Sequence, residues 1–332
     1  MRTLAVIFGC TAIAVATGCN GGGTSSLPAT RGTSGTTYVL AADALRAFSA
    51  GANGSATPLA QYAYPPAARP IGVASAPDGT VYLLTSAISD STALTVSIYA
   101  PHATTLQQQL QITIAPGSVA KGIALVDDGI DIATLNDAYT YPYGPATQPS
   151  PIRALHYRDA SAFTADAAGT LYVGHLDRAN PAQSSIDVYA PRAAGTAAPT
   201  QTMPAQGLIG HIAVASDGTI YGASTTTQLD AGSVVFTVPA SGTANRVVAT
   251  YGNGTADPSL RVMGLSVNGD GLVYVGLSTS YDPAWSWQPA LSRLDVFDRG
   301  AGAANGANPA PKLQVTGIAP VGEHLDAVAL GT

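Results

Sequence analysis

The sequence predicts an all-β protein, a six-bladed β-propeller whose closing blade is split between the N-terminal and C-terminal ends of the chain. Three observations predict this fold. A strand–turn–strand pattern recurs along the chain, a third strand ending in an aromatic residue follows each copy, and each end of the chain holds only part of a repeat. Repeats that contain only strand signals form sheets stacked around an axis.

Each repeat begins with a hairpin. Clear copies are IGVASAPDGTVYLLT from Ile71, SAFTADAAGTLYVGH from Ser161, HIAVASDGTIYGAST from His211 and MGLSVNGDGLVYVGL from Met263, and a weaker copy begins at Gly122. The turn is built on Asp-Gly or Ala-Gly, and the second strand alternates apolar residues. A tyrosine recurs in register in the second strand, at Tyr38, Tyr82, Tyr172, Tyr221 and Tyr274, with Asp131 in its place in the third unit. This regularity indicates packing.

The third strands number six. They are counted by their aromatic residues, Phe48, Tyr99, Tyr141 or Tyr143, Tyr189, Phe236 and Phe297. Near the N-terminus, TTYVL has the second-strand pattern with no first strand before it, and HLDAVAL at the C-terminus is a first strand alone. The two halves should complete one blade, which removes the exposed sheet edges that would otherwise pair with other chains.

The DGT-x-Y hairpins and the I-x-V-Y-x-P strands resemble those of NHL-like and gluconolactonase-like six-bladed propellers, over residues 36 to 332. The resemblance implies the fold and does not identify the chemistry, because one fold hosts many functions. Gluconolactonase-like enzymes bind a divalent metal through a channel Glu with Asn and Asp. Glu323 could match that Glu, but the Asn partners have no counterpart that can be placed.

The N-terminus resembles a bacterial lipoprotein signal. Residues 1–18 carry a basic residue, a short apolar run and small residues before Cys19, and the run is too short for a comfortable transmembrane helix. The resemblance implies that Cys19 is acylated after cleavage, although Ala16 departs from the usual leucine. In the other interpretation, Cys19 is part of an ordinary cleavage region.

Residues 19–35 form the acylated Cys and a Gly, Ser and Thr rich tether, and residues 36–332 form one propeller domain. By resemblance to Gram-negative lipoproteins, Asn20 gives no inner-membrane retention signal, so we expect an exported protein at the outer membrane, facing the periplasm or the surface. Cys10 leaves with the signal peptide, so no disulfide, Cys nucleophile or thiolate metal site is expected.

Charge limits the partners. Charged residues are only 10% of the chain, the net charge is −6, and the lysines are Lys121 and Lys312. No basic stripe could neutralise a row of phosphates, so nucleic acid is not expected. We expect a monomer that contacts the membrane through its lipid.

Charged residues gather at the starts of the first strands, where six strands should converge on the mouth of the central channel. This candidate ligand-binding set is Arg69, Lys121, Arg158, Asp159, His211, Arg261, Glu323 and His324. In one interpretation these residues pair with one another and tie the blades together. In the other, the cations hold an acidic or hydroxyl-rich ligand that Glu323 and Asp159 orient.

Other candidates follow from the same placement. A metal site from Glu323, His324, His211 and Asp159 has suitable ligand types but no short-range spacing. Asp78, Asp128, Asp217 and Asp270 precede turn glycines, and we interpret them as turn formers at the opposite face. The remaining histidines, His102, His156 and His175, have no local acidic partner pattern.

A long loop between the second and third strands of the sixth unit contains both tryptophans. Tyr281, Trp285 and Trp287 could stack on a sugar or a peptide at the channel face, or could fold over the channel as a plug. No nucleophile motif accompanies them.

The sequence favours a non-catalytic binding or scaffolding module at the cell envelope, with a carbohydrate, a peptide or an envelope protein as ligand and with no cofactor. The alternative is a metal-dependent hydrolase or lyase of the propeller lactonase type, with a divalent metal near Glu323.

Overall fold

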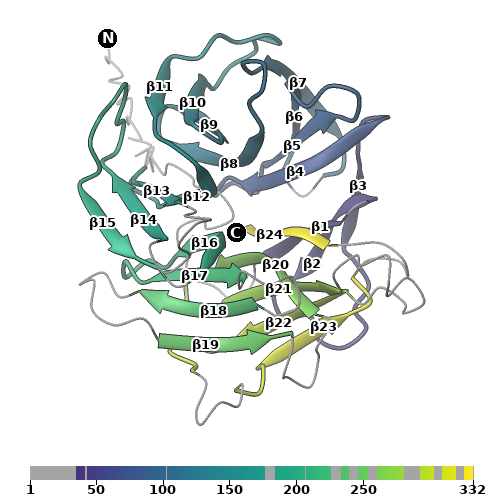
Figure 1. The fold of residues 1–332 in the computed structure, drawn as a ribbon. Helices are drawn as coiled ribbons and strands as arrows, with labels where there is room; N and C mark the ends of the chain where they lie inside the picture. The colour runs from purple at the N-terminus through teal and green to yellow at the C-terminus, as the bar shows by residue number, and fades with distance from the viewer. Residues whose placement is uncertain are drawn as a thin grey trace, which may run out of the picture.

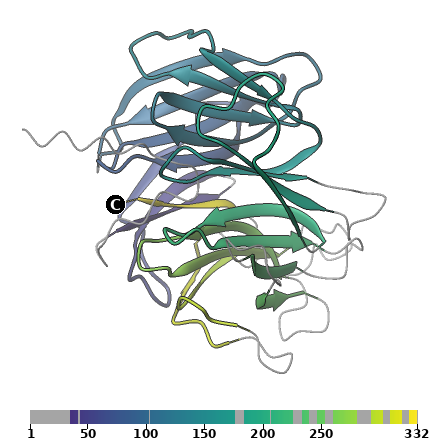
Figure 2. The same ribbon diagram turned by 90° about the vertical axis from the view of Figure 1, so that its left-hand side faces the viewer.

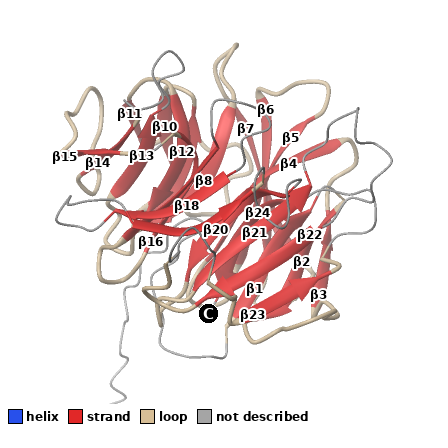
Figure 3. Cartoon of the chain, turned by 60° about the horizontal axis from the view of Figure 1, so that its bottom comes forward, coloured by secondary structure: helices blue, strands red, loops and turns tan. Residues whose placement is uncertain are grey.

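The computed structural model describes residues 35–41, 43–101, 103–175, 184–205, 207–225, 233–238, 246–252, 260–279, 292–302, 309–318 and 325–331. These residues form six four-stranded antiparallel sheets and contain no helix (Figure 3). No membrane-spanning helix is therefore found within the described ranges.

The six sheets are the blades, numbered here from the split one. Blade 1 contains β24 (Leu325–Gly331), β1 (Thr36–Ala41), β2 (Ala44–Ser49) and β3 (Ala60–Ala63). Blade 2 contains β4 (Ala68–Ser75), β5 (Val81–Ala87), β6 (Ala93–Tyr99) and β7 (Leu106–Thr113). Blade 3 contains β8 (Ala120–Val126), β9 (Gly129–Thr134), β10 (Asp137–Pro142) and β11 (Arg153–His156).

The second half of the ring repeats this order. Blade 4 contains β12 (Ala160–Ala165), β13 (Leu171–His175), β14 (Ser185–Tyr189) and β15 (Gln201–Pro204). Blade 5 contains β16 (Leu208–Val214), β17 (Ile220–Thr225), β18 (Ser233–Val238) and β19 (Arg246–Tyr251). Blade 6 contains β20 (Leu260–Val267), β21 (Val273–Thr279), β22 (Ser292–Phe297) and β23 (Leu313–Thr316).

Each innermost strand packs against the innermost strand of the next blade, in the order β4, β8, β12, β16, β20 and β24 (Figure 1). The ring closes because β24 also packs against β4. The predicted split blade is confirmed. Strand β24 pairs antiparallel with β1, from Thr36 opposite Gly331 to Leu40 opposite Ala327. Figure 2 shows this yellow C-terminal strand beside the purple N-terminal strands.

Six apolar cores hold the blades together, one between each pair of neighbours. The aromatic residues predicted to pack do so. Tyr38, Tyr172, Tyr221 and Tyr274 are buried, and so are all six third-strand aromatics, with Tyr141 rather than Tyr143 in blade 3. Burial of one such side chain contributes about 1.5–3 kcal/mol, so the conserved spacing of the repeat is explained by these interblade contacts.

The outer edges of three blades are covered by the neighbouring blade. Gly54 of blade 1 receives and donates backbone hydrogen bonds along β23, with N–O distances of 2.9 and 2.7 Å. Gly195 of blade 4 does the same along β11, at 2.7 Å in both directions, and Thr147 of blade 3 accepts a bond from Gln111 in β7 at 2.7 Å. These loops satisfy backbone groups that an open edge strand would present to other chains.

Candidate functional site

A β-bulge interrupts all six inner strands at the same place. The pairing of each inner strand with its neighbour skips one residue, namely Ile71, Lys121, Ser161, Gly210, Met263 and Asp326. Bulges bend a strand and redirect side chains, and they are common at barrel rims and next to active sites. The bulges therefore form a ring at one end of the channel, which we call the mouth.

The residue that follows the bulge is small in most blades. It is Gly72, Gly122, Ala162 and Gly264 in blades 2, 3, 4 and 6, whereas blade 5 has His211. The close approach of the strands needs this small size, because a Cβ on Gly72 would lie 3.3 Å from Cγ2 of Ile123 and 3.6 Å from Cα of Gly122. A Cβ on Gly122 itself would meet no atom within 4 Å, so this residue borders open space.

The small residues leave a hollow of about 100 Å³, open to solvent. It is lined by residues of blades 2 to 5, which are Ile71, Gly72, Val73, Lys121, Gly122, Ile123, Ala162, Phe163, Gly210, His211 and Ile212. Val73, Ile123, Phe163 and Ile212 are buried residues of the cores between the blades, and they also line this hollow. The described part of the mouth is therefore a cup with a largely apolar lining.

His211 is partly exposed in this cup, and its ring forms a hydrogen bond to the backbone of Val262 in the next blade. The Val262 N–H already donates to Ser233 Oγ at 3.2 Å, so the ring N–H of His211 donates to the Val262 carbonyl. Burial lowers the pKa of His211 to about 4, although that hydrogen bond opposes the shift. The imidazole is thus neutral at physiological pH, with one nitrogen available as an acceptor.

Cations surround the cup. Lys121 is exposed and lines it, Arg69 is exposed in β4, and Arg158 is exposed in the turn before β12. Arg261 is partly buried in β20 and donates from Nη1 to the Leu260 carbonyl at 2.9 Å. Among the described residues, Arg69, Lys121 and Arg158 form no ion pair. Glu323, the acid that the sequence places with them, lies outside the described ranges, so the mutual pairing of this set stays a prediction.

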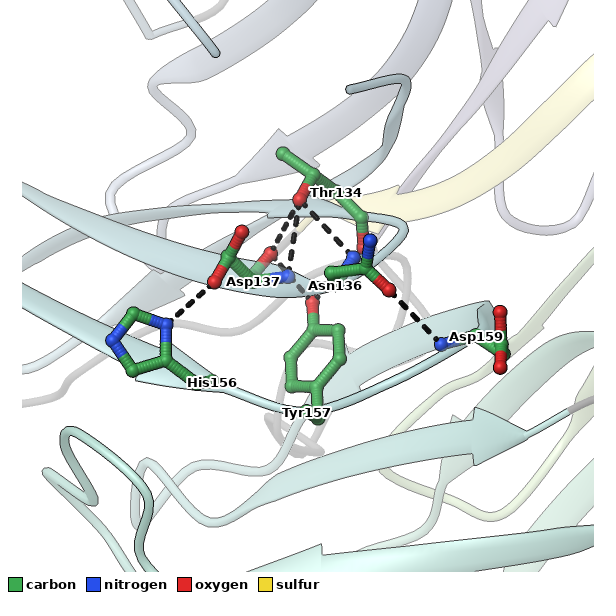
Figure 4. A network of polar contacts seen from close by, with 6 residues as sticks. All are labelled: Thr134, Asn136, Asp137, His156, Tyr157 and Asp159. Carbon is green, nitrogen blue, oxygen red and sulfur yellow. Dashed lines mark hydrogen bonds and ion pairs between the residues drawn. The ribbon is translucent and has the colours of Figure 1, made fainter. Parts of the chain in front are cut away.

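A polar network holds the turn that carries Arg158 and Asp159 (Figure 4). Tyr157 is buried, and its hydroxyl donates to the carbonyls of Asp137 at 2.7 Å and Thr134 at 3.2 Å. The Asp159 N–H donates to Asn136 Oδ1 at 3.3 Å, and Asp159 has a positive φ of 52°. The turn between β9 and β10 therefore fixes the start of β12 from the side.

His175 fastens the same turn from blade 4. Its Nδ1 lies 2.6 Å from the Arg158 carbonyl, and its Nε2 lies 3.1 Å from Asp187 Oδ2, close enough for an ion pair although too bent for a regular hydrogen bond. Burial disfavours the charged imidazole, but Asp187 and the Arg158 carbonyl outweigh it and raise the pKa of His175. Both ring nitrogens face oxygen acceptors, an arrangement that only the imidazolium satisfies.

These His–Asp pairs were not foreseen from the sequence, because the paired acids, Asp137 and Asp187, are distant from their histidines along the chain. His156 Nδ1 lies 2.6 Å from Oδ1 of Asp137, and His175 forms an ion pair with Asp187 of the adjacent strand. A further buried carboxylate, Asp295, accepts hydrogen bonds from Tyr251 of the neighbouring blade at 3.1 Å and from Gln314 at 3.0 Å. The sequence does contain a signal for Asp187, which is the Asp of the I-D-V-Y strand. It becomes informative only when the pairing register of that strand with the His175 strand is known.

The turn residues lie at the other end of the strands, as expected. Asp78 Oδ1 accepts from the Thr80 N–H at 2.8 Å, and Asp217 accepts from Thr219 at 2.9 Å. In the turn of Asp270 the capping acceptor is instead Asn268, which bonds the Asp270 N–H at 3.0 Å.

Asp128 differs from the other turn residues, since it forms a two-bond ion pair with Arg153 at 2.7 and 3.1 Å and lies 3.8 Å from Arg192 of blade 4. Asp217 forms an ion pair with Arg299 of blade 6. These turns thus also connect neighbouring blades.

Several sequence candidates lie outside the described residues, namely Cys19, Tyr281, Trp285, Trp287, Glu323 and His324. The metal site that would combine Glu323 and His324 with His211 and Asp159 therefore stays a hypothesis. Within the described ranges, no group of three or more His, Cys, Asp or Glu is placed to hold a metal ion.

No protein-family model matches the sequence, and neither does any curated protein. Among solved structures, the chain is similar to a Bacteroides caccae protein of unknown function, with a TM-score of 0.56, 12% identity, and coverage of 90% of this chain and 98% of that one. It is also similar to a Bacteroides fragilis protein provisionally named a 6-phosphogluconolactonase, with a TM-score of 0.48, 12% identity, and coverage of 91% and 99%. At such identities the likeness shows a fold and no activity, and that fold is the β-propeller.

Proposed function

We propose that the chain is a binding module, tethered to the outer membrane through acylated Cys19, whose anionic ligand or partner docks at the mouth of the propeller. The observation that carries the proposal is the charge of the mouth. At the starts of the described inner strands, four cations, Arg69, Lys121, Arg158 and Arg261, accompany one acid, Asp159, on a chain whose net charge is −6. Such a local field attracts anions and raises their rate of encounter.

The shape of the mouth supports the same function. The bulges, the small residues after them and the buried apolar residues beside them produce a cup, and ligand sites commonly combine an apolar surface with a few placed polar groups. Trp285 and Trp287 lie outside the described residues, and the sequence prediction that they add stacking surface on this face is part of the proposal.

The test is a thermal-shift screen of the full chain against small organic anions and their uncharged amides. We expect anions to raise Tm and the amides to leave it unchanged. Lys121→Met should reduce the effect, whereas Lys312→Met should not, because Lys312 pairs with the exposed Asp298 at 2.8 Å away from the mouth. Equal shifts for the wild type and Lys121→Met would contradict the proposal.

The anchor has its own test. Cys19→Ser should move the protein from the membrane fraction to the soluble fraction, since a second membrane-binding signal is not part of the proposal. A variant that stays with the membrane would show that Cys19 is not the attachment point.

A further inference from the structure

One position of the six-fold ring departs from its equivalents. After the bulge, blades 2, 3, 4 and 6 have glycine or alanine, and blade 5 has His211. The four small residues contribute no polar side-chain atom, so His211 is the neutral polar side chain that lines the described part of the cup. The hydrogen bond to the Val262 backbone fixes the ring to the adjacent blade and determines which nitrogen is free to accept.

Lys121 is the second polar side chain of the cup, and it occupies the bulge of blade 3. Its ammonium is a single compact charge with three donors and no acceptor. The cup therefore offers one positive donor group from blade 3 and one neutral acceptor from blade 5. Gly122, Ala162 and Gly210 also line the cup and add no polar side chain to it.

We propose that the cup binds a small monocarboxylate that carries a hydroxyl beside the carboxylate, with Lys121 contacting the carboxylate and His211 accepting the hydrogen bond. This inference rests on the proposed function and adds the chemical class of the ligand. One ammonium balances one negative charge, and a neutral imidazole acceptor is satisfied by a ligand O–H or N–H. A carboxylate without such a donor would leave the acceptor of His211 unpaired.

Three matched probes separate the two contacts. Lactate has both the carboxylate and the hydroxyl, propionate lacks the hydroxyl, and lactamide lacks the charge. Affinities of the full chain in detergent micelles are measured by ligand-observed NMR titration. We expect lactate to bind about fivefold more tightly than propionate, the effect of one hydrogen bond, and lactamide to bind most weakly.

The variants assign the contacts to residues. His211→Phe should lower lactate affinity to the level of propionate and leave propionate unchanged, whereas His211→Asn, which keeps an acceptor, should retain the preference for lactate. Gly122→Val should weaken both acids by filling the cup, because its Cβ meets no atom within 4 Å and the fold is not strained. Gly51→Val, at an exposed turn with equal free space, is the control for added bulk.

The outcomes distinguish the two proposals. Equal affinities of the wild type for lactate and propionate, both above lactamide, would overturn the ligand class and leave the anion-binding function in place. A preference for lactate that survives in His211→Phe would overturn the role of His211. Binding of none of the three probes, or equal binding of all three, would overturn the proposed function as well. Should His211→Phe fail to fold, the wild-type comparison and Gly122→Val still decide.

Discussion

Asp131 should make the protein less stable as the pH rises, and Asp131→Asn should remove that loss. Asp131 stands where five blades have tyrosine, and it is 1% exposed. Thr140 donates to Oδ1 at 2.5 Å, the Arg153 guanidinium lies 4.0 Å away, and Oδ2 has no hydrogen-bond partner. Burial raises the pKa of Asp131 to about 6 from the ordinary 3.8, despite the contacts with Thr140 and Arg153.

The direction and the magnitude of this pH dependence of the free energy of unfolding follow from the proton that Asp131 retains in the folded state. A raised folded-state pKa contributes stability that is complete below the unfolded pKa near 3.8 and is lost as the pH passes the folded pKa near 6. A shift of about two units corresponds to about 3 kcal/mol. The free energy of unfolding of Asp131→Asn, relative to the wild type, should therefore rise by about 3 kcal/mol between about pH 4 and pH 8.

Urea unfolding followed by tyrosine fluorescence at a series of pH values measures this difference. Asp128→Asn is the control, because hydrogen bonding to Arg153 lowers the pKa of Asp128, despite some opposing burial, and its pH dependence should have the opposite sign. A pH-independent difference between Asp131→Asn and the wild type would refute the reasoning, since it would mean that Asp131 is ionised alike in both states.

Three further perturbations test other parts of the structure. The raised pKa of His175 stabilises the fold at low pH and loses this effect as the pH rises through it, so His175→Asn should destabilise more at about pH 5.5 than at pH 8.5 in the same unfolding assay, and a constant effect would contradict the imidazolium. Gly222→Ala should cost about 1–3 kcal/mol, because its Cβ would lie 2.4 Å from Cζ of Phe236, and an unchanged unfolding midpoint would show that this packing within blade 5 is looser than described. Metal analysis of the purified protein tests the lactonase alternative, which requires one divalent ion per chain that disappears in Glu323→Ala.

The fold was predictable because its signals are local. Alternating apolar residues, Asp-Gly turns and register tyrosines lie within single hairpins, and each two-stranded hairpin is half of a four-stranded blade. The split closure also followed, since a second strand without a first at one end requires its partner at the other.

The mouth was only partly predictable. Lys121 and His211 were expected there because the repeat places the starts of the first strands together, and both line the cup. The bulges could not be foreseen, because a bulge is a mismatch between two paired strands and neither strand shows it alone. The partners of His175 depend on register in the same way, since Asp187 lies on the adjacent strand, where it faces Val173.

The pairing of β24 with β1 has a consequence for biosynthesis. Residues 36–41 leave the ribosome early, yet their inner neighbour is the strand at residues 325–331. Throughout translation, blade 1 is therefore a three-stranded sheet with an unpaired inner edge, and its contacts with blade 6 are missing. Contacts between distant residues form slowly, and unpaired strand edges are prone to aggregation. Ring closure should be the last step of folding, because this inner edge stays unpaired until residues 325–331 join it.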